Sequence, residues 1–316
     1  MSTNKSNSFE TIPCPVCESL SFKNVLTLTP REFSGDDRSY YNFDIIGCHQ
    51  ETKFSYVECS RCKFIYVNPR LKKEFNDTVY NEVKSDQKIG KAWAFDGSDL
   101  SKLYNTFHKW SAIDIFLVGI SLFSDRFSKA KNIGQKEIKL LDYGSGFGFG
   151  HILDLCKVFS IDGHGVDIDK GRIDHCASKG LNVSRPEDLS STEFDIVIST
   201  SVIEHVIDLN AYFEYISSRL SSGGIFIFNG LSPKIIPVEQ KKGKYKNVHP
   251  IEHLSLFTKS ALLQITQKHG FTPVPRATLF QAMVKNPLKA FSLLPYFLLN
   301  STLFWKGNFN AIMVKQ

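Results

Sequence analysis

The chain has 316 residues, a formal net charge of +6, 42% hydrophobic residues and 22% charged residues. This composition is ordinary for a globular protein and excludes the disordered and fibrous classes. The length suits an α/β domain with an appended module. Basic residues are scattered apart from a lysine group at 241–246, so the charge argues against a nucleic-acid-binding protein.

The first ten residues, MSTNKSNSFE, are polar and contain no apolar core of a secretory signal, so we expect a cytoplasmic protein. Its seven cysteines are then reduced, and metal binding or packing explains them better than disulfides. No membrane span is expected. The most apolar stretch, 290–305, is too short and contains Pro295 and Asn300, so it indicates a buried helix pair or a lid that touches a membrane surface.

Two cysteine pairs share one spacing, CPVC and CSRC. Their members are Cys14, Cys17, Cys59 and Cys62. A spacer of two residues lets a tight turn direct both thiolates at one metal ion, and two such knuckles complete the tetrahedral sulfur site that zinc prefers. Because four thiolates leave no open position for a substrate, the pattern predicts a structural zinc ribbon over residues 9–80. Cys48 and His49 are alternative ligands.

Apolar residues at intervals of three and four predict a helical linker or lid over residues 81–135. From 136 to 316, strands alternate with helices, which predicts a Rossmann-like α/β fold: a doubly wound, mostly parallel seven-stranded sheet. The expected strands lie at 137–143, 163–168, 181–184, 194–200, 225–230 and 309–315. The expected helices lie at 149–159, 170–180, 210–224 and 258–270; Gly223 and Gly224 stop the third, and Thr258 begins the fourth.

The segment LLDYGSGFGFG at 140–150 places four glycines at every second position after an apolar run that ends in Asp142. Glycine permits positive φ and lets the backbone approach a ligand where the first strand turns into its helix. A dinucleotide fingerprint needs glycines at positions one, three and six, but counting from Gly144 puts Phe149 at the sixth position. The turn therefore does not match a dinucleotide site.

An acidic residue followed by alternating glycines resembles the class I S-adenosylmethionine methyltransferases, in which this turn packs against the adenosine and methionine parts of the cofactor. The resemblance implies the following cofactor-binding residues: Asp142, Gly144, Ser145, Gly146 and Gly148. A carboxylate at Asp142 suits the positive ammonium of the methionine end, whereas it would repel a pyrophosphate.

The next strand ends at Asp167, where a carboxylate accepts hydrogen bonds from both ribose hydroxyls, with Ile168 beside it. This position occurs in dinucleotide enzymes too, so it supports nucleoside binding without choosing the class. Asp169 is expected to cap the following helix. The segment SRPEDLSS resembles the family's adenine-binding loop, which implies that Glu187 or Asp188 meets the adenine amino group.

The segment SVIEHV at 201–206 resembles the LEHV signature of many small-molecule methyltransferases of this class. It follows the fourth strand, which ends near Ser199, and the resemblance implies that Glu204 and His205 line the pocket. A structural role for His205, capping or bridging loops, stays open.

Methyl transfer to a hydroxyl needs an aligned acceptor and a base, for which histidine is suited. The segment NVHPIEHLSLFT supplies His249 and His253 after the fifth strand, and it resembles the HEH segment of sugar C-methyltransferases, which also carry an N-terminal four-cysteine module. Glu252 and His253 match that segment, but Ile251 replaces its first histidine, so we do not expect that group's carbon chemistry here. We expect His253 to be the base or to orient the acceptor, with His249 second; the alternative is a buried structural His253.

Together these features predict an S-adenosylmethionine-dependent methyltransferase that carries a structural zinc ion and acts on a small molecule: a sugar, sugar nucleotide or glycan precursor. One alternative is an RNA-modifying methyltransferase whose ribbon and lysine group hold RNA, against which the modest charge argues. The other is a non-catalytic scaffold that keeps the nucleoside pocket, against which the intact glycine turn argues.

Overall fold

The computed structural model describes residues 8–33, 48–49, 51–78, 119–120, 138–145, 151–190, 193–275, 277–280, 302–305 and 307–316. Its strands form an eight-stranded sheet, a four-stranded sheet and a two-stranded pair. The linker expected at 81–135 lies outside the described residues except for 119–120, and so do Gly146 and Gly148 of the glycine turn.

The large sheet contains β6 (Lys139–Tyr143), β7 (Asp162–Val166), β8 (Val183–Ser184), β9 (Phe194–Ser199), β10 (Leu220–Leu231), β12 (Phe271–Pro273), β13 (Thr302–Trp305) and β14 (Asn308–Lys315). Seven strands follow the order β12-β14-β10-β9-β6-β7-β8, and β13 is an eighth strand beside β14. Strands β6 to β10 pair in parallel, whereas β14 is antiparallel to β10 and β12. This arrangement confirms the Rossmann-like, mostly parallel fold and adds one strand to the seven expected.

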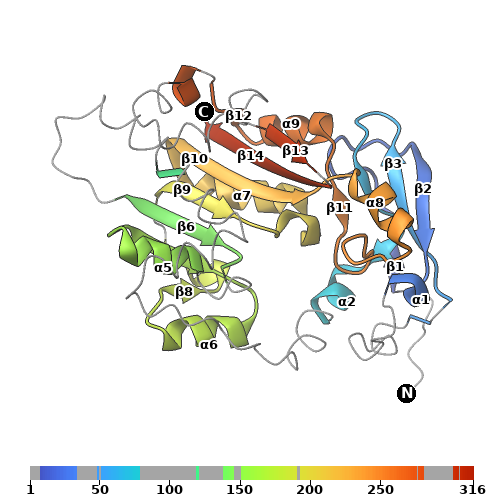
Figure 1. Ribbon diagram of the computed structural model, residues 1–316, viewed down its shortest axis with the longest axis horizontal. Helices are drawn as coiled ribbons and strands as arrows, with labels where there is room; N and C mark the ends of the chain where they lie inside the picture. Colours follow the sequence, from blue (N-terminus) through green and yellow to red (C-terminus); the bar gives the residue numbers. More distant parts are fainter. Residues whose placement is uncertain are drawn as a thin grey trace.

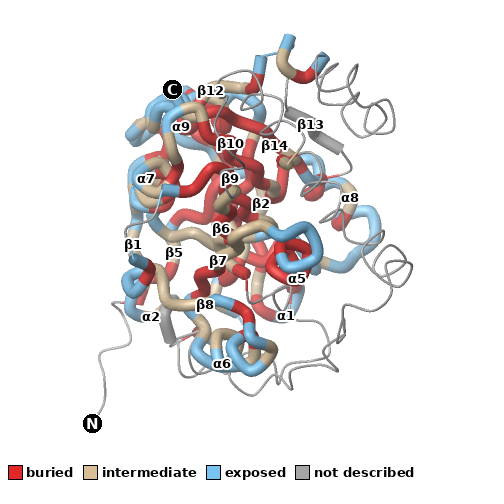
Figure 2. Tube along the Cα trace, turned by 90° about the vertical axis from the view of Figure 1, so that its left-hand side faces the viewer, coloured by how far each residue is buried: buried red, intermediate tan, exposed pale blue. Residues whose placement is uncertain are grey.

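The helices that accompany the sheet include α5 (His151–Val158), α6 (Lys170–Ser178), α7 (Leu209–Arg219), α8 (Ile235–Lys242) and α9 (Lys259–Lys268). Figure 2 shows the buried strands at the centre and the exposed outer sides of the helices around them. Asp169 caps α6 and Thr258 caps α9, as expected, by accepting from the third following amide. Close contact between α5 and β7 needs Gly163, where a Cβ would lie 2.7 Å from that of Cys156.

Helix α7 ends at Arg219, so the expectation that Gly223 and Gly224 stop it was wrong. Strand β10 already begins at Leu220, a buried residue that pairs with Phe194 of β9. The pairing register then shifts between Leu220 and Ile225, and Gly223 has a φ of +74° in that stretch. The helix therefore ends before the glycines because Leu220 is buried and paired in the sheet. The glycines lie instead where the register of strand β10 shifts.

The N-terminal part forms the four-stranded sheet, with β2 (Phe22–Leu28), β3 (Phe54–Cys59) and β4 (Ile65–Val67). Its fourth strand, β11 (Ser255–Leu256), comes from the C-terminal half and pairs antiparallel with β4. Beside this sheet lie the pair β1 (Phe9–Glu10) and β5 (Arg70–Leu71) and the short helices α1 (Pro30–Phe33) and α2 (Lys73–Thr78). The N-terminal module, blue in Figure 1, is thus joined to the large domain through a shared sheet.

The apolar stretch 290–305 lies outside the described residues up to 301, and its end, Thr302–Trp305, is strand β13. A buried helix pair was one of two expectations for this stretch, the other being a lid. For residues 302–305 the helical expectation was wrong, because they extend the large sheet by pairing with β14. No helix in the described ranges has both the length and the apolar character needed to cross a membrane.

Candidate functional site

The glycine turn begins at the carboxyl end of β6 and lies against the segment that follows β9. Gly144 has a φ of +85°, and a Cβ there would lie 2.4 Å from Cγ2 of Val202. The amides of Gly144 and Ser145 both donate to the Val166 carbonyl, at 2.8 and 3.1 Å. These contacts bring the carboxyl ends of β6 and β7 and the segment after β9 together at one edge of the sheet. Open α/β sheets bind ligands at this edge.

Two buried carboxyl groups stand at this edge. Asp142 is 3% exposed and Asp167 is 7% exposed. Burial, and then the neighbouring Asp167, raise the pKa of Asp142 to about 8. Asp167 accepts a hydrogen bond from the Asp169 amide at 2.8 Å. Two neighbouring buried carboxyl groups favour a positively charged or hydrogen-bond-donating ligand, because such a ligand offsets the desolvation and the mutual repulsion of their ionised forms.

The other expected cofactor residues flank these carboxyl groups along the chain. Ser199 is buried at the end of β9, and Ile168 is exposed after β7. Glu187 and Asp188 are both exposed on the 3₁₀ turn η4 (Pro186–Asp188), and Tyr215 of α7 fixes this turn by donating to the Pro186 carbonyl at 3.0 Å. Their roles toward a cofactor stay predictions.

A second group of polar side chains forms where the 3₁₀ turn η5 (Ile203–His205) meets the loop between α8 and β11. The Leu254 amide donates to the Glu204 carbonyl at 2.7 Å, and Nδ1 of His205 donates to the Glu252 carbonyl at 3.0 Å. The rings of His205 and His253 lie 4.6 Å apart. One side-chain ligand atom each from Glu204, His205 and His253 lies within 4.8 Å of the others. These three residues are called the Glu-His-His cluster below.

Glu204 is 3% exposed, and burial raises its pKa to about 7. Its Oε2 atom has no hydrogen-bond partner among the described residues. An unsatisfied buried carboxyl oxygen costs free energy, so this atom is suited to a bound proton, cation or ligand hydroxyl.

Three residues that the sequence did not single out support His253. Its Nδ1 donates to the Asn247 carbonyl at 2.6 Å. Asn247 in turn donates its amide to Glu239 of α8 at 2.9 Å, and the Tyr56 hydroxyl of β3 donates to the His253 carbonyl at 2.7 Å. Glu239 stands in a lysine-rich stretch and Tyr56 in an ordinary alternating strand, so neither carried a functional signal.

The two histidines of the loop lie in different surroundings. His253 is half-buried beside His205, whereas His249 is 6% exposed and packs against the Phe33 ring of α1 with centroids 4.5 Å apart. From the sequence, the loop with both histidines was expected directly after the fifth strand of the large domain, which is β10. In the structure, helix α8 lies between β10 and this loop. Glu252 is buried and contributes its carbonyl to His205.

The four paired cysteines come together in the N-terminal module, where their Sγ atoms all lie within 4.8 Å of one another. Cys14 and Cys62 have their Sγ atoms 3.5 Å apart, and so do Cys17 and Cys59. Zinc–sulfur bonds of about 2.3 Å in a tetrahedron require sulfur atoms about 3.8 Å apart, so the four thiols fit a zinc ion after a small expansion.

The two knuckles also share one backbone form. Glu18 and Lys63, which directly follow the second cysteine of each pair, have φ values of 62° and 64°. In each knuckle an amide donates back to the carbonyl of the first cysteine, Glu18 to Cys14 at 2.8 Å and Lys63 to Cys59 at 3.1 Å. Cys48, a ligand alternative, belongs instead to the hydrophobic core around Phe33 and Phe54.

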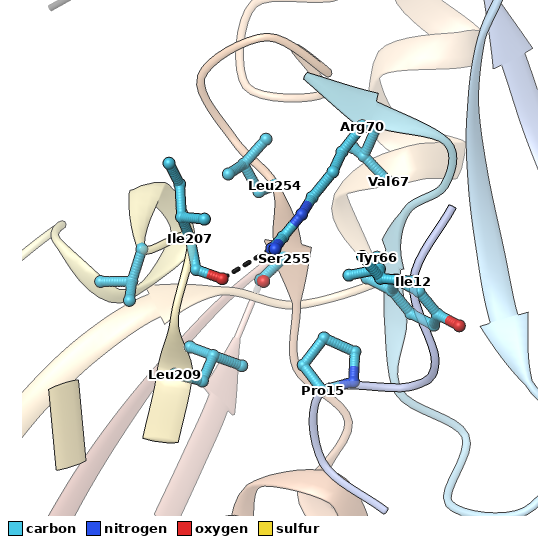
Figure 3. A pocket seen from close by; sticks show the side chains of 10 residues that line it. Ile12, Pro15, Tyr66, Val67, Arg70, Ile207, Leu209, Leu254 and Ser255 are labelled. Carbon is cyan, nitrogen blue, oxygen red and sulfur yellow. Dashed lines mark hydrogen bonds between the residues drawn. The ribbon is translucent and has the colours of Figure 1, made fainter. Parts of the chain in front are cut away.

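A small hollow marks the junction between the N-terminal module and the large domain (Figure 3). Arg70 points across it and donates from Nη1 to the Ile207 carbonyl at 2.6 Å, while its Nε bonds to Glu10 at 2.9 Å. The remaining walls are mostly apolar and include Leu209 and Leu254. The hollow has room for about one water molecule, so it is part of the interface rather than a ligand pocket.

Known proteins resemble part of this chain. Residues 119–275 match the family model described as a methyltransferase domain. Ubiquinone biosynthesis O-methyltransferase of Paramagnetospirillum magneticum is 36% identical over 101 residues, which are 28% of this chain and 39% of that protein. The enzyme of the same name from Pelagibacter ubique is 25% identical over 168 residues, covering 50% of this chain and 67% of that protein.

Solved structures that resemble the chain include the plantazolicin methyltransferase BpumL in complex with SAH, with 15% identity, a TM-score of 0.45, and coverage of 69% of this chain and 91% of that one. Another is an S-adenosylmethionine-dependent methyltransferase from Archaeoglobus fulgidus, with 20% identity, a TM-score of 0.39, and coverage of 69% and 100%. The family match over 119–275 covers the part of the chain from β6 to β12, which contains the buried carboxyl pair and the Glu-His-His cluster.

Proposed function

We propose that the protein transfers a methyl group from S-adenosylmethionine to a hydroxyl group of a small molecule. The observation that carries the proposal is the pair of buried carboxyl groups, Asp142 and Asp167, beside the Gly144 turn at the carboxyl edge of the sheet. A cofactor with a cationic amino acid end and a ribose diol matches these two groups. Two relatives named O-methyltransferases support oxygen as the attacked atom.

Each residue then has a defined task. S-adenosylmethionine, when bound, supplies an electrophilic methyl group and leaves as S-adenosylhomocysteine. Asp142 balances the ammonium of the methionine end, and Asp167 accepts hydrogen bonds from the ribose hydroxyls. His253 takes the proton of the acceptor hydroxyl at Nε2 or orients that hydroxyl, while its Nδ1 keeps a proton bonded to the Asn247 carbonyl. His205 and Glu252 hold His253 and its loop in place.

The acceptor class divides into two hydroxyl chemistries. The resemblance of the 247–258 segment to sugar methyltransferases favours a sugar, sugar nucleotide or glycan precursor. The relatives' names point to a ring hydroxyl of a quinone precursor. A base beside the acceptor serves both, since an alcohol or phenol must lose its proton to become methylated on oxygen.

An acceptor assay tests this function. The protein, S-adenosylmethionine and either sugar nucleotides or catechol-type phenols should yield an O-methylated product and S-adenosylhomocysteine, both measured by mass spectrometry. His253→Ala should lower turnover by at least about tenfold while its affinity for S-adenosylhomocysteine stays near that of the wild type. The matched control is His269→Ala, because His269 bonds to Asn210 at the end of α9, outside the cluster. Unchanged turnover in His253→Ala would remove His253 from the reaction.

Asp142 makes cofactor affinity depend on pH. Folded protein keeps this carboxyl protonated up to about pH 8, whereas the unfolded chain releases the proton near its ordinary value of 3.8, so burial costs stability progressively as pH rises through that window. A bound ammonium offsets this cost by lowering the pKa of Asp142. Binding therefore releases a proton, and affinity for S-adenosylhomocysteine should rise several-fold between about pH 6 and about pH 8.

Calorimetry in buffers of different ionisation enthalpy measures the proton release directly. Asp142→Asn should bind at least about tenfold more weakly and show no pH dependence over that range. Asp195→Asn is the control, because Asp195 is equally buried but bonds to the Lys139 amide at the opposite end of β6, 3.0 Å away. Equal pH dependence in Asp142→Asn would contradict a charge contact at this position.

We also propose that the N-terminal module is a zinc ribbon. The support is the matching spacing, backbone form and sulfur separations of the two knuckles. Four thiolates close the coordination sphere, so such an ion stabilises the module and takes no part in methyl transfer.

Metal analysis after dialysis against a weak chelator should find about one zinc ion per chain. Cys62→Ser should lose that zinc and unfold at a lower temperature, because the folding of the module is linked to metal binding. Cys156→Ser should retain it, since Cys156 is buried against β7 in α5, outside the ribbon. Zinc-free wild-type protein with an unchanged melting temperature would overturn the assignment.

A further inference from the structure

We propose that the Glu-His-His cluster binds a second cation, a first-row divalent transition ion, at a site separate from the ribbon. Glu204, His205 and His253 supply one carboxylate oxygen and two imidazole nitrogens within 4.8 Å of one another. Around such an ion these atoms lie about 3 Å apart, so small side-chain rotations complete the set.

Both imidazoles have the tautomer that a metal ligand needs. Nδ1 of His205 faces the Glu252 carbonyl at 3.0 Å, and Nδ1 of His253 faces the Asn247 carbonyl at 2.6 Å. A carbonyl oxygen only accepts, so each Nδ1 carries the proton and each neutral ring keeps its lone pair on Nε2. Hydrogen bonds from the second ring nitrogen to backbone carbonyls are the usual support of histidine ligands.

The buried carboxyl group gives a second, independent reason. Oε2 of Glu204 has no hydrogen-bond partner among the described residues, although the side chain is 3% exposed. A cation held by the Glu204 carboxylate and the two imidazoles gives this carboxylate a partner and repays its desolvation. Two nitrogens and one oxygen favour zinc, iron, cobalt or manganese over magnesium and calcium, which prefer oxygen ligands.

The backbone around the cluster is fixed from three sides, as a metal site requires. The Leu254 amide bonds to the Glu204 carbonyl, Tyr56 bonds to the His253 carbonyl, and Glu239 holds Asn247. Three protein ligands leave coordination positions open, in contrast to the four thiolates of the ribbon. If the proposed function holds, an acceptor hydroxyl bound at an open position has a lowered pKa and releases its proton to solvent. Nε2 of His253 is then a ligand rather than the base, and His253 orients the acceptor through the cation.

Cobalt(II) is the probe, added to zinc-loaded, chelator-dialysed protein without cofactor or acceptor. The wild type should bind about one cobalt ion per chain and show visible d–d bands of a nitrogen- and oxygen-ligated ion, without the strong thiolate charge-transfer bands of cobalt in the ribbon. Equilibrium dialysis with metal analysis measures the stoichiometry.

Glu204→Gln and His253→Gln should each weaken cobalt binding by at least about tenfold. His164→Gln should leave it unchanged, because His164 pairs with Asp162 at 3.0 Å and belongs to neither cluster. Circular dichroism and zinc content verify the fold of each variant. The proposal is overturned if wild-type protein binds no cobalt beyond the ribbon, or if both cluster variants bind it as the wild type does. Cobalt binding without an O-methylated product would instead refute only the proposed function.

Discussion

The pairing of β11 with β4 is the constraint on which the position of the Glu-His-His cluster depends. It joins a strand of the large domain to the sheet of the cysteine module, with Ser255 opposite Tyr66 and Leu256 opposite Ile65. Because His253 stands two residues before β11, the module determines where that histidine lies, and the Tyr56 bond to its carbonyl fixes the position further. The N-terminal cysteine module thus supports the part of the large domain that carries the Glu-His-His cluster.

The fold of the large domain could be predicted from the sequence, because alternating strands and helices leave few arrangements of a parallel sheet. The caps at Asp169 and Thr258 followed from local chemistry as well. The end of α7 was predicted wrongly, because the prediction used only the local glycines. The pairing of Leu220 with Phe194, which ends the helix earlier, depends on a strand distant in the sequence. Strand β13 was missed for a similar reason: its apolar sequence suits a helix or a strand, and only its partner β14 decides.

Only part of the candidate site could be placed from the sequence. Asp142, Gly144 and Asp167 stand on consecutive turns of a repeating pattern, so spacing alone placed them at one edge. The Glu-His-His cluster combines a turn after β9 with a loop almost fifty residues later in the sequence. Tyr56 of the N-terminal module, which bonds to the His253 carbonyl, lies almost two hundred residues before His253. Such long-range contacts leave no periodic signal in a single sequence, and the same holds for the support that Glu239 gives to Asn247.

The central claim is that the carboxyl edge of the sheet holds S-adenosylmethionine rather than a dinucleotide. A calorimetric titration of the zinc-loaded protein with S-adenosylhomocysteine, and separately with NAD, tests it most directly, with Asp167→Ala as the comparison variant. S-adenosylhomocysteine should bind at about micromolar affinity, NAD should not bind, and the variant should lose binding. Equal binding of NAD, or no binding of either ligand, would contradict the account.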